Sequence, residues 1–265
     1  MEKKKVLLAL SGGLDTSFCA VYLAREKGME VHSAIVNTGG FTGQELEQVQ
    51  DHASKLGVVS HTVLDITAEY YQKCLRYMIF GNVLRNRSYP LSVSSERTFQ
   101  AIALVNHARK NGFSYIAHGS TAAGNDQVRF DLVIQVLAPE MKILTPIREL
   151  KISREEEIEY LCKQGIGMNP EEVKYSINQG IWGTSVGGKE TLSSKDELPD
   201  QAYPTKVTKS GSEQIGLEFD MGEPVGLNGQ RLEPLVVIRE LEGIADPWGV
   251  GRDVHVGDTI IGIKG

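Results

Sequence analysis

Apolar runs and amphipathic stretches alternate along the first part of the chain. Residues 6–10 form a continuous apolar run, which is typical of a strand buried on both faces of a parallel sheet. Residues 16–27 then carry apolar side chains at helical spacing and stop at Gly28. Further strand-like runs alternate with helical patterns, the strands at 30–36, 58–64, 114–117 and 142–144 and the helices at 44–56, 67–80 and 98–111. This order predicts an α/β fold, in which helices cover both faces of a parallel sheet and ligands bind at the carboxyl ends of its strands.

The pattern changes after residue 165. Ser153 and Glu156 form a capping box that opens one more helix, which we expect to end near Gly165. Beyond it glycine is more frequent and helical periodicity fades, while Asn228-Gly229 predicts a type I′ hairpin and strand-like runs occur at 214–219 and 259–263. We therefore expect an α/β domain over residues 1–165 and a mixed α+β domain over residues 166–265. The last strand-like run has no neighbour after it, so we expect the second domain to be incomplete.

Charge and cysteine content narrow the function classes. The chain has 28 Lys and Arg against 34 Asp and Glu, a net charge of -6, and no basic block follows the lysines at 3–5. This balance argues against a nucleic-acid partner. The cysteines are odd in number and far apart, which argues against a disulfide framework or a zinc site, at Cys19, Cys74 and Cys162. We find no signal peptide and no membrane-spanning run, so we expect a cytoplasmic protein without membrane contact.

A glycine- and hydroxyl-rich loop joins the first predicted strand to the first predicted helix. It reads S-G-G-L-D-T-S over residues 11–17. The two glycines let the backbone turn tightly and approach a ligand, and the N–H groups and positive dipole of the first helical turn attract an anion. The pattern matches neither the Walker loop nor the Rossmann G-x-G-x-x-G. The loop therefore predicts a phosphate site of another kind.

Two other polar segments are candidates for ligand binding. Residues 82–96 interrupt the periodicity with Asn, Arg and Ser and predict a binding loop. Residues 118–130 read H-G-S-T-A-A-G-N-D-Q-V-R-F and follow the fourth predicted strand. They again place glycines and short polar groups at the carboxyl end of a strand, where ligands are expected.

These motifs carry a family resemblance. The loop at 11–17 resembles the S-G-G-x-D-T-S signature of ATP pyrophosphatases, which cleave ATP between its α- and β-phosphates. Together with H-G-x-T-x-x-G-N-D-Q-V-R-F, it makes the chain resemble the argininosuccinate synthase family. The resemblance implies a ligase that joins citrulline to aspartate through a citrullyl-adenylate and releases AMP and pyrophosphate, in arginine biosynthesis and the urea cycle. It also implies a nucleotide-binding domain followed by a synthetase domain, and a homotetramer if the family's C-terminal region is present.

The resemblance assigns a role to each matching position. It implies that ATP, with Mg²⁺ held by its phosphates rather than by a dedicated protein site, binds at Ala9, Ser11, Gly12, Gly13, Leu14, Asp15, Thr16, Ser17, Val36 and Gly119. Citrulline is expected at Tyr89, Ser94, Arg97, Asn125, Arg129, Ser176 and Ser185. Aspartate is expected at Thr121, Asn125 and Asp126, and the catalytic set is Asp15, Asp126 and Arg129. Asp15 would orient the metal or the loop, or would complement the helix dipole. We expect His118 to act in packing or hydrogen bonding.

The chain also departs from the family pattern. Where many members carry A-D-x-G-Q after the second strand, residues 36–40 read V-N-T-G-G. An acidic residue that many members place after G-V-G-R falls at Gly257, so either Asp253 or Asp258 substitutes for it or the chain functions without it. The family also continues well past residue 265. Two alternatives stay open. One is another ATP-pyrophosphatase-type adenylating enzyme, which the charge and cysteines disfavour, and the other is an ATP-binding fragment or pseudoenzyme without turnover.

Overall fold

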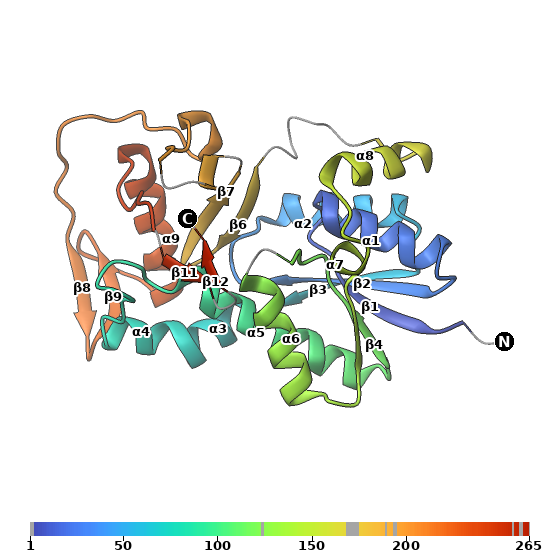
Figure 1. Ribbon diagram of the computed structural model, residues 1–265. Coiled ribbons are helices and arrows are strands. Elements are labelled where there is room, and N and C mark those ends of the chain that lie inside the picture. The colour runs from blue at the N-terminus through green and yellow to red at the C-terminus, as the bar shows by residue number, and fades with distance from the viewer. Residues whose placement is uncertain are drawn as a thin grey trace. The chain divides into compact units, whose positions relative to one another are not determined.

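The computed structural model describes residues 3–122, 125–167, 175–188, 190–192, 195–255, 257–259 and 262–264 (Figure 1). The chain forms two compact units. The first consists of Met1–Ile66, Glu96–Lys174 and Thr259–Ile261, and the second of Thr67–Ser95, Tyr175–Asp258 and Gly262–Gly265. The predicted domain boundary near Ile166 stays a prediction.

The first unit is built on a five-stranded parallel sheet. In chain order the strands are β1 (Lys5–Ala9), β2 (Glu30–Asn37), β3 (Ser60–Asp65), β4 (Tyr115–Ala117) and β5 (Lys142–Leu144). Their order in the sheet is β3-β2-β1-β4-β5. β1 therefore lies at the centre, with Val6 paired to Val31 on one side and to Tyr115 on the other. The chain moves outward in one direction after β1 and in the other after β4, so the switch point at which α/β sheets bind ligands lies between these two strands.

Helices cover both faces of this sheet, as the alternating pattern predicts (Figure 1). Leu8 of β1 is buried with Phe18 and Leu161 in one cluster, whereas its neighbour Leu7 is buried with Leu104 and Ile134 in the other. Successive residues of a strand face opposite ways, so the uninterrupted apolar run of β1 fills both clusters. The helices are α1 (Leu14–Arg25), α2 (Gly43–Lys55), α5 (Ser92–Lys110), α6 (Asn125–Leu137), α7 (Pro146–Leu150) and α8 (Arg154–Lys163). The α/β prediction is confirmed.

Local signals account for several helix ends. Ser153 and Glu156 form the predicted capping box at the start of α8, since each binds the backbone N–H of the other residue. Thr42 and Glu45 form a second one at the start of α2. α5 begins at Ser92, earlier than the predicted residue 98, so the polar loop is shorter than its composition indicates.

The second unit begins with a helical segment and continues with antiparallel strands. The predicted helix over 67–80 contains a π-helical turn, η1 (Tyr71–Leu75), between α3 (Thr67–Tyr70) and α4 (Arg76–Phe80). β6 (Ser176–Gly180) pairs with β7 (Gly183–Gly187), and a three-stranded sheet has the order β10-β9-β8. The remaining elements are β8 (Leu217–Asp220), β9 (Glu223–Leu227), β10 (Gln230–Arg231), α9 (Pro234–Ala245), β11 (Gly257–Thr259), β12 (Gly262–Lys264) and short 3-10 turns at Glu190–Leu192, Asp200–Ala202 and Asp246–Trp248.

This unit contains a hairpin turn that the sequence predicts and a helix that it does not. Leu227 pairs with Gln230, and both intervening residues have positive φ, 53° at Asn228 and 81° at Gly229, which confirms the predicted type I′ hairpin. The helix α9 was not identified from the sequence. It begins at a proline in the first helical turn, which fixes φ and needs no backbone donor there.

Candidate functional site

The loop between β1 and α1 has the geometry of an anion site. Gly12 adopts a φ of 84°, which side chains rarely permit, and Gly13 caps α1 without any side-chain hydrogen bond. Ser11 is exposed, and its hydroxyl lies 3.3 Å from that of Thr16. The N–H groups of the first turn are therefore not satisfied by a capping side chain at Gly13, and two hydroxyl groups stand beside them.

Ser17 differs from Thr16, which also donates to the Gly13 carbonyl, at 3.2 Å, in its burial and in its contact with α2. Its side chain is fully buried and donates a hydrogen bond to the carbonyl of Gly13 at 2.8 Å. It therefore accepts from Nε2 of His52 on α2, at 2.7 Å. These contacts fix the loop against α2. The predicted phosphate contact of Ser17 stays a prediction, and His52 is a residue that the sequence analysis did not single out.

Asp15 in the first turn of α1 is held by α8. Arg154 Nη1 lies 3.7 Å from its carboxylate, and the carboxyl group of Glu157 is hydrogen-bonded to it. Burial raises the pKa of Asp15, and the Arg154 charge opposes this. Burial, reinforced by the Asp15 charge, raises the pKa of Glu157 to about 8. Glu157 is only 2% exposed, and with this pKa it keeps its proton at neutral pH.

Gly119 brings the second motif directly against the first. A Cβ atom placed there would lie 3.1 Å from the Cβ of Asp15, 3.2 Å from its carbonyl carbon and 3.2 Å from Cγ2 of Thr16. Such distances are shorter than an ordinary van der Waals contact, so no side chain fits without a shift. The segment after β4 therefore passes within contact distance of the phosphate loop, as the position of the switch point predicts.

His118, next to Gly119, is buried in a polar network. Its Nε2 donates to Asp131 at 2.8 Å, its Nδ1 accepts from the backbone N–H of Ser120 at 3.4 Å, and its ring stacks on Phe130. Arg148 of α7 binds the other oxygen of Asp131 at 2.8 Å. Although burial acts in the opposite direction, hydrogen bonds from His118 and Arg148 lower the pKa of Asp131. The network fits the predicted packing and hydrogen-bonding role of His118.

Three of the predicted amino-acid-binding residues meet at the start of α6. Arg129 Nη1 donates to one carboxylate oxygen of Asp126 at 2.8 Å, and Arg97 Nε of α5 donates to the other at 3.2 Å. The side chains of Arg97 and Arg129 are 14% and 18% exposed. Asn125 begins α6 and Thr121 is exposed in the loop before it. Residues 123–124 lie outside the described residues.

The other predicted citrulline residues belong to the second unit. Ser185 pairs with Asn178 across the β6–β7 hairpin, so Ser176, two residues before Asn178, shares a face with both. The hairpin also contacts the polar loop, because Trp182 Nε1 donates to the carbonyl of Pro90 at 3.0 Å. The ring of Tyr89 lies 5.0 Å from that of His255, and Ser94 donates to the carbonyl of Leu91 at 3.1 Å.

The positions proposed to replace the family's acidic residue are only partly described. The carboxylate of Asp253 accepts from the backbone N–H of the next residue, Val254, at 2.8 Å. Gly257 and Asp258 lie in β11, and the side chain of Asp258 is not among the described ones.

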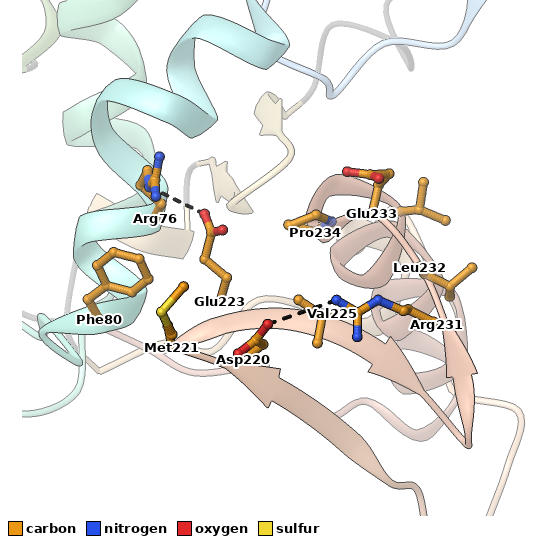
Figure 2. Close-up of a pocket in the computed structure, with 11 residues that line it drawn as sticks. Arg76, Phe80, Asp220, Met221, Glu223, Val225, Arg231, Leu232, Glu233 and Pro234 are labelled. Atoms are coloured by element: carbon orange, nitrogen blue, oxygen red, sulfur yellow. Dashed lines mark ion pairs between the residues drawn. The ribbon is translucent and has the colours of Figure 1, made fainter.

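A cavity of about 620 Å³ lies within the second unit (Figure 2). It is lined by Arg76 and Phe80 of α4, by the β8–β9 turn, and by residues 231–234 and 236. Arg76 forms an ion pair with Glu223 at 3.3 Å, and Arg231 with Asp220 at 3.9 Å. No predicted site residue lines this cavity.

The described residues contain no group of three or more His, Cys, Asp or Glu side chains placed to hold a metal ion. No helix within the same ranges is long and apolar enough to cross a membrane.

The parallel sheet, the glycine loop after β1 and the second motif after β4 define a nucleotide-binding α/β domain. A family model described as the arginosuccinate synthase N-terminal HUP domain matches residues 5–167, and one for the C-terminal domain matches residues 175–265. The chain belongs to the argininosuccinate synthase family. It is 38% identical over 266 residues to argininosuccinate synthase of Dictyoglomus thermophilum, covering 100% of this chain and 66% of that protein.

Two other relatives show a similar identity and coverage. Argininosuccinate synthase of Methanocaldococcus jannaschii is 39% identical over 267 residues, and that of Lactococcus lactis is 36% identical over 269 residues. In both cases all of this chain and 67% of the relative are covered. The chain spans about two thirds of the length of the curated relatives that it matches.

Proposed function

We propose that the protein joins citrulline to aspartate at the expense of ATP, forming argininosuccinate through a citrullyl-adenylate and releasing AMP and pyrophosphate. Membership of the family supports this reaction. The observation that carries it is the contact of Gly119 with Asp15 and Thr16. This contact places the motif proposed to bind the amino acids beside the loop proposed to bind the pyrophosphate.

The first turn of α1 would bind the leaving pyrophosphate. Its backbone N–H groups and the hydroxyls of Ser11 and Thr16 are donors that can stabilise the charge developing on that group. Mg²⁺ would be held by the phosphate oxygens and would neutralise part of that charge. Asp15 would act by orienting the loop, because Arg154 and Glu157 already bind its carboxylate.

The cluster at the start of α6 would bind the amino acids. A guanidinium group binds a carboxylate through two parallel hydrogen bonds, so Arg129 and Arg97 suit the carboxylate of citrulline. Asp126 would bind the amino group of aspartate, assisted by Thr121 and Asn125. Tyr89, Ser94, Ser176 and Ser185 of the second unit would contribute further citrulline contacts. The same proposal includes a cytoplasmic location, a domain boundary near Ile166 and, if the family's C-terminal region is present, a homotetramer.

The test is pyrophosphate release from MgATP by the full chain, measured with citrulline alone, aspartate alone, both and neither. We expect release that requires citrulline, and argininosuccinate only when aspartate is also present. ATP binding without turnover under all four conditions would instead support an ATP-binding protein without this activity. Release that is independent of both amino acids would favour another adenylating enzyme of the same fold.

A further inference from the structure

Two buried polar side chains on α5 have no part in the reaction proposed above. Glu96 is 2% exposed and Gln100, one helical turn later, is 8% exposed. The hydroxyl of Thr38, which is fully buried, donates to Oε1 of Glu96. Gln100 Nε2 donates to the same Glu96 oxygen at 3.2 Å and to the carbonyl of Val36 at 3.4 Å. Glu96 and Gln100 thus bind the end of β2, where the nucleotide is expected.

The other end of the Gln100 amide faces Arg97. Arg97 Nη1 donates to Gln100 Oε1 at 2.6 Å, and Arg97 Nε donates to Asp126 at 3.2 Å. The partners fix the orientation of the amide, since its oxygen faces a guanidinium and its nitrogen faces two acceptors. A continuous set of hydrogen bonds therefore connects the Val36 carbonyl with the Asp126 carboxylate, through Gln100 and Arg97. All of these residues belong to the first unit.

Burying these groups is costly, which argues that they serve a purpose. A buried amide or carboxyl group loses its hydration and needs protein partners in exchange, whereas an apolar pair at the same positions would need none. Buried polar networks whose members are satisfied make a structure more rigid and define one arrangement of side chains. Thr38 also occupies the variable position of the A-D-x-G-Q segment from which this chain departs.

We propose that Glu96 and Gln100 are positioning residues for Arg97, which connect its guanidinium group to the end of β2 and so couple nucleotide binding there to binding of the citrulline carboxylate. The identity of the amino acid rests on the proposed function. The connection between Val36 and Arg97 does not, because it is a property of α5 and β2 alone.

The experiment follows the Arg97 Nε–H signal by ¹⁵N NMR, with Arg97→Lys used for assignment, while the magnesium complex of α,β-methylene-ATP is added. The variants are Gln100→Leu, which keeps the volume and removes the amide, and the near-isosteric Thr38→Val and Glu96→Gln.

Matched controls are Gln135→Leu on the exposed side of α6 and Glu140→Gln in an exposed ion pair with Arg109. Citrulline affinity is measured with and without the nucleotide.

In the wild-type chain and both controls we expect the Arg97 signal to shift on nucleotide binding, and citrulline affinity to rise about tenfold, a typical coupling between two sites. In Gln100→Leu we expect the signal not to shift and the gain to fall to about twofold or less, with nucleotide affinity within about twofold of wild type. Thr38→Val and Glu96→Gln should also reduce the shift of the Arg97 signal. They provide the test if Gln100→Leu does not fold.

The outcomes separate this proposal from the proposed function. An Arg97 signal that does not move at saturating nucleotide, or that moves equally in Gln100→Leu, overturns the connection and leaves the reaction intact. A signal that responds through Gln100 in a chain that does not bind citrulline supports the connection and overturns the proposed reaction. A chain that does not bind the nucleotide overturns both.

Discussion

The carboxyl group of Glu157 on α8 is hydrogen-bonded to that of Asp15, the acidic residue of the phosphate loop. Two carboxylates this close cannot both be ionised without strong repulsion, so one of them keeps its proton. Asp15 stands in the first turn of α1, whose dipole favours a negative charge, and faces Arg154. Glu157 is the more deeply buried and has the pKa of about 8. It is therefore the group that holds the proton at neutral pH.

This pair gives the first prediction, a stability that falls as pH rises. The pKa of Glu157 is raised in the folded state from 4.5 to about 8, so between these values the folded chain binds more protons than the unfolded chain. The free energy of unfolding should decrease over this range, by about 1.4 kcal/mol for each pKa unit at most. Glu157→Gln should remove the decrease and be the more stable protein above about pH 8. Urea denaturation at several pH values measures this.

A matched control lies on the same helix. Glu159 is exposed and pairs with Lys163 at 2.6 Å, so Glu159→Gln should keep the pH dependence of the wild type. Equal slopes in Glu157→Gln and wild type would contradict a protonated Glu157 at neutral pH.

The second prediction concerns Gly119→Ala. The added methyl group would press on the backbone of Asp15, and because this is not a flexible chain end, the phosphate loop must shift. Overpacking of this kind costs about 1–3 kcal/mol, so nucleotide affinity should fall about tenfold or more. Gly43→Ala is the control, since a Cβ atom there meets nothing within 4 Å. Calorimetric titration with MgATP compares them, and unchanged affinity in Gly119→Ala would show that the two motifs are not tightly packed.

The third prediction separates the two serines of the loop. Ser17→Ala removes the buried partner of His52 and should lower the free energy of unfolding by about 1 kcal/mol, as for a lost buried hydrogen bond. Ser11→Ala changes an exposed hydroxyl and should leave stability unchanged while it weakens nucleotide binding. Chemical denaturation and nucleotide titration of both variants measure the two effects. A Ser17→Ala chain of wild-type stability would contradict the structural role of this hydroxyl.

The fourth prediction concerns Asp131, which connects His118 to Arg148. Its pKa is lowered in the folded state, so its ionised form stabilises the fold above the ordinary value of 3.8, and this contribution is lost as pH falls through the folded-state pKa. Asp131→Asn should reduce stability by about 1–3 kcal/mol at neutral pH and by less in acid. Asp51→Asn, at an exposed position, is the control. Denaturation at neutral and acidic pH tests this, and a constant difference between Asp131→Asn and wild type would argue against an ionised Asp131 in the network.

The fifth prediction tests the amino-acid cluster. Asp126→Ala removes the carboxylate that Arg97 and Arg129 share, and should raise the KM for aspartate much more than it weakens ATP binding. Steady-state kinetics and nucleotide titration give the two numbers. Equal losses in both would count against a role for Asp126 in binding aspartate.

Sequence patterns predicted those parts of the fold that depend on nearby residues. The buried strand at residues 6–10, the Ser153 capping box and the Asn228-Gly229 turn are local signals, and the structure confirms all three. Glu157 could not be predicted, because it lies in the acidic run R-E-E-E-I-E, which is typical of an exposed first helical turn. Its burial depends on the packing of α8 against α1, which no local pattern contains.

The sequence predicted several residues of the candidate site but not the contacts between them. The motifs identified Arg97, Asp126 and Arg129 individually, and the structure shows that they contact one another. Gln100 gave no signal, because a glutamine in an amphipathic helix is ordinary. α5 begins at Ser92 and not at the predicted residue 98, because the serines at 92, 94 and 95 have low helix propensity and are held in the helix by tertiary contacts such as that of Ser95 with Tyr70.

The central position of β1 has a consequence for synthesis of the protein. Val6 pairs with Val31 early along the chain but also with Tyr115, so one edge of β1 has no partner until the fourth strand leaves the ribosome. During that interval the nascent chain exposes an apolar strand edge, which can pair with other chains. Pairing of such distant segments is also slow, because a long loop must close first. The contact between the two motifs is therefore a late event in folding, and demand for chaperones should be greatest before residue 115 emerges.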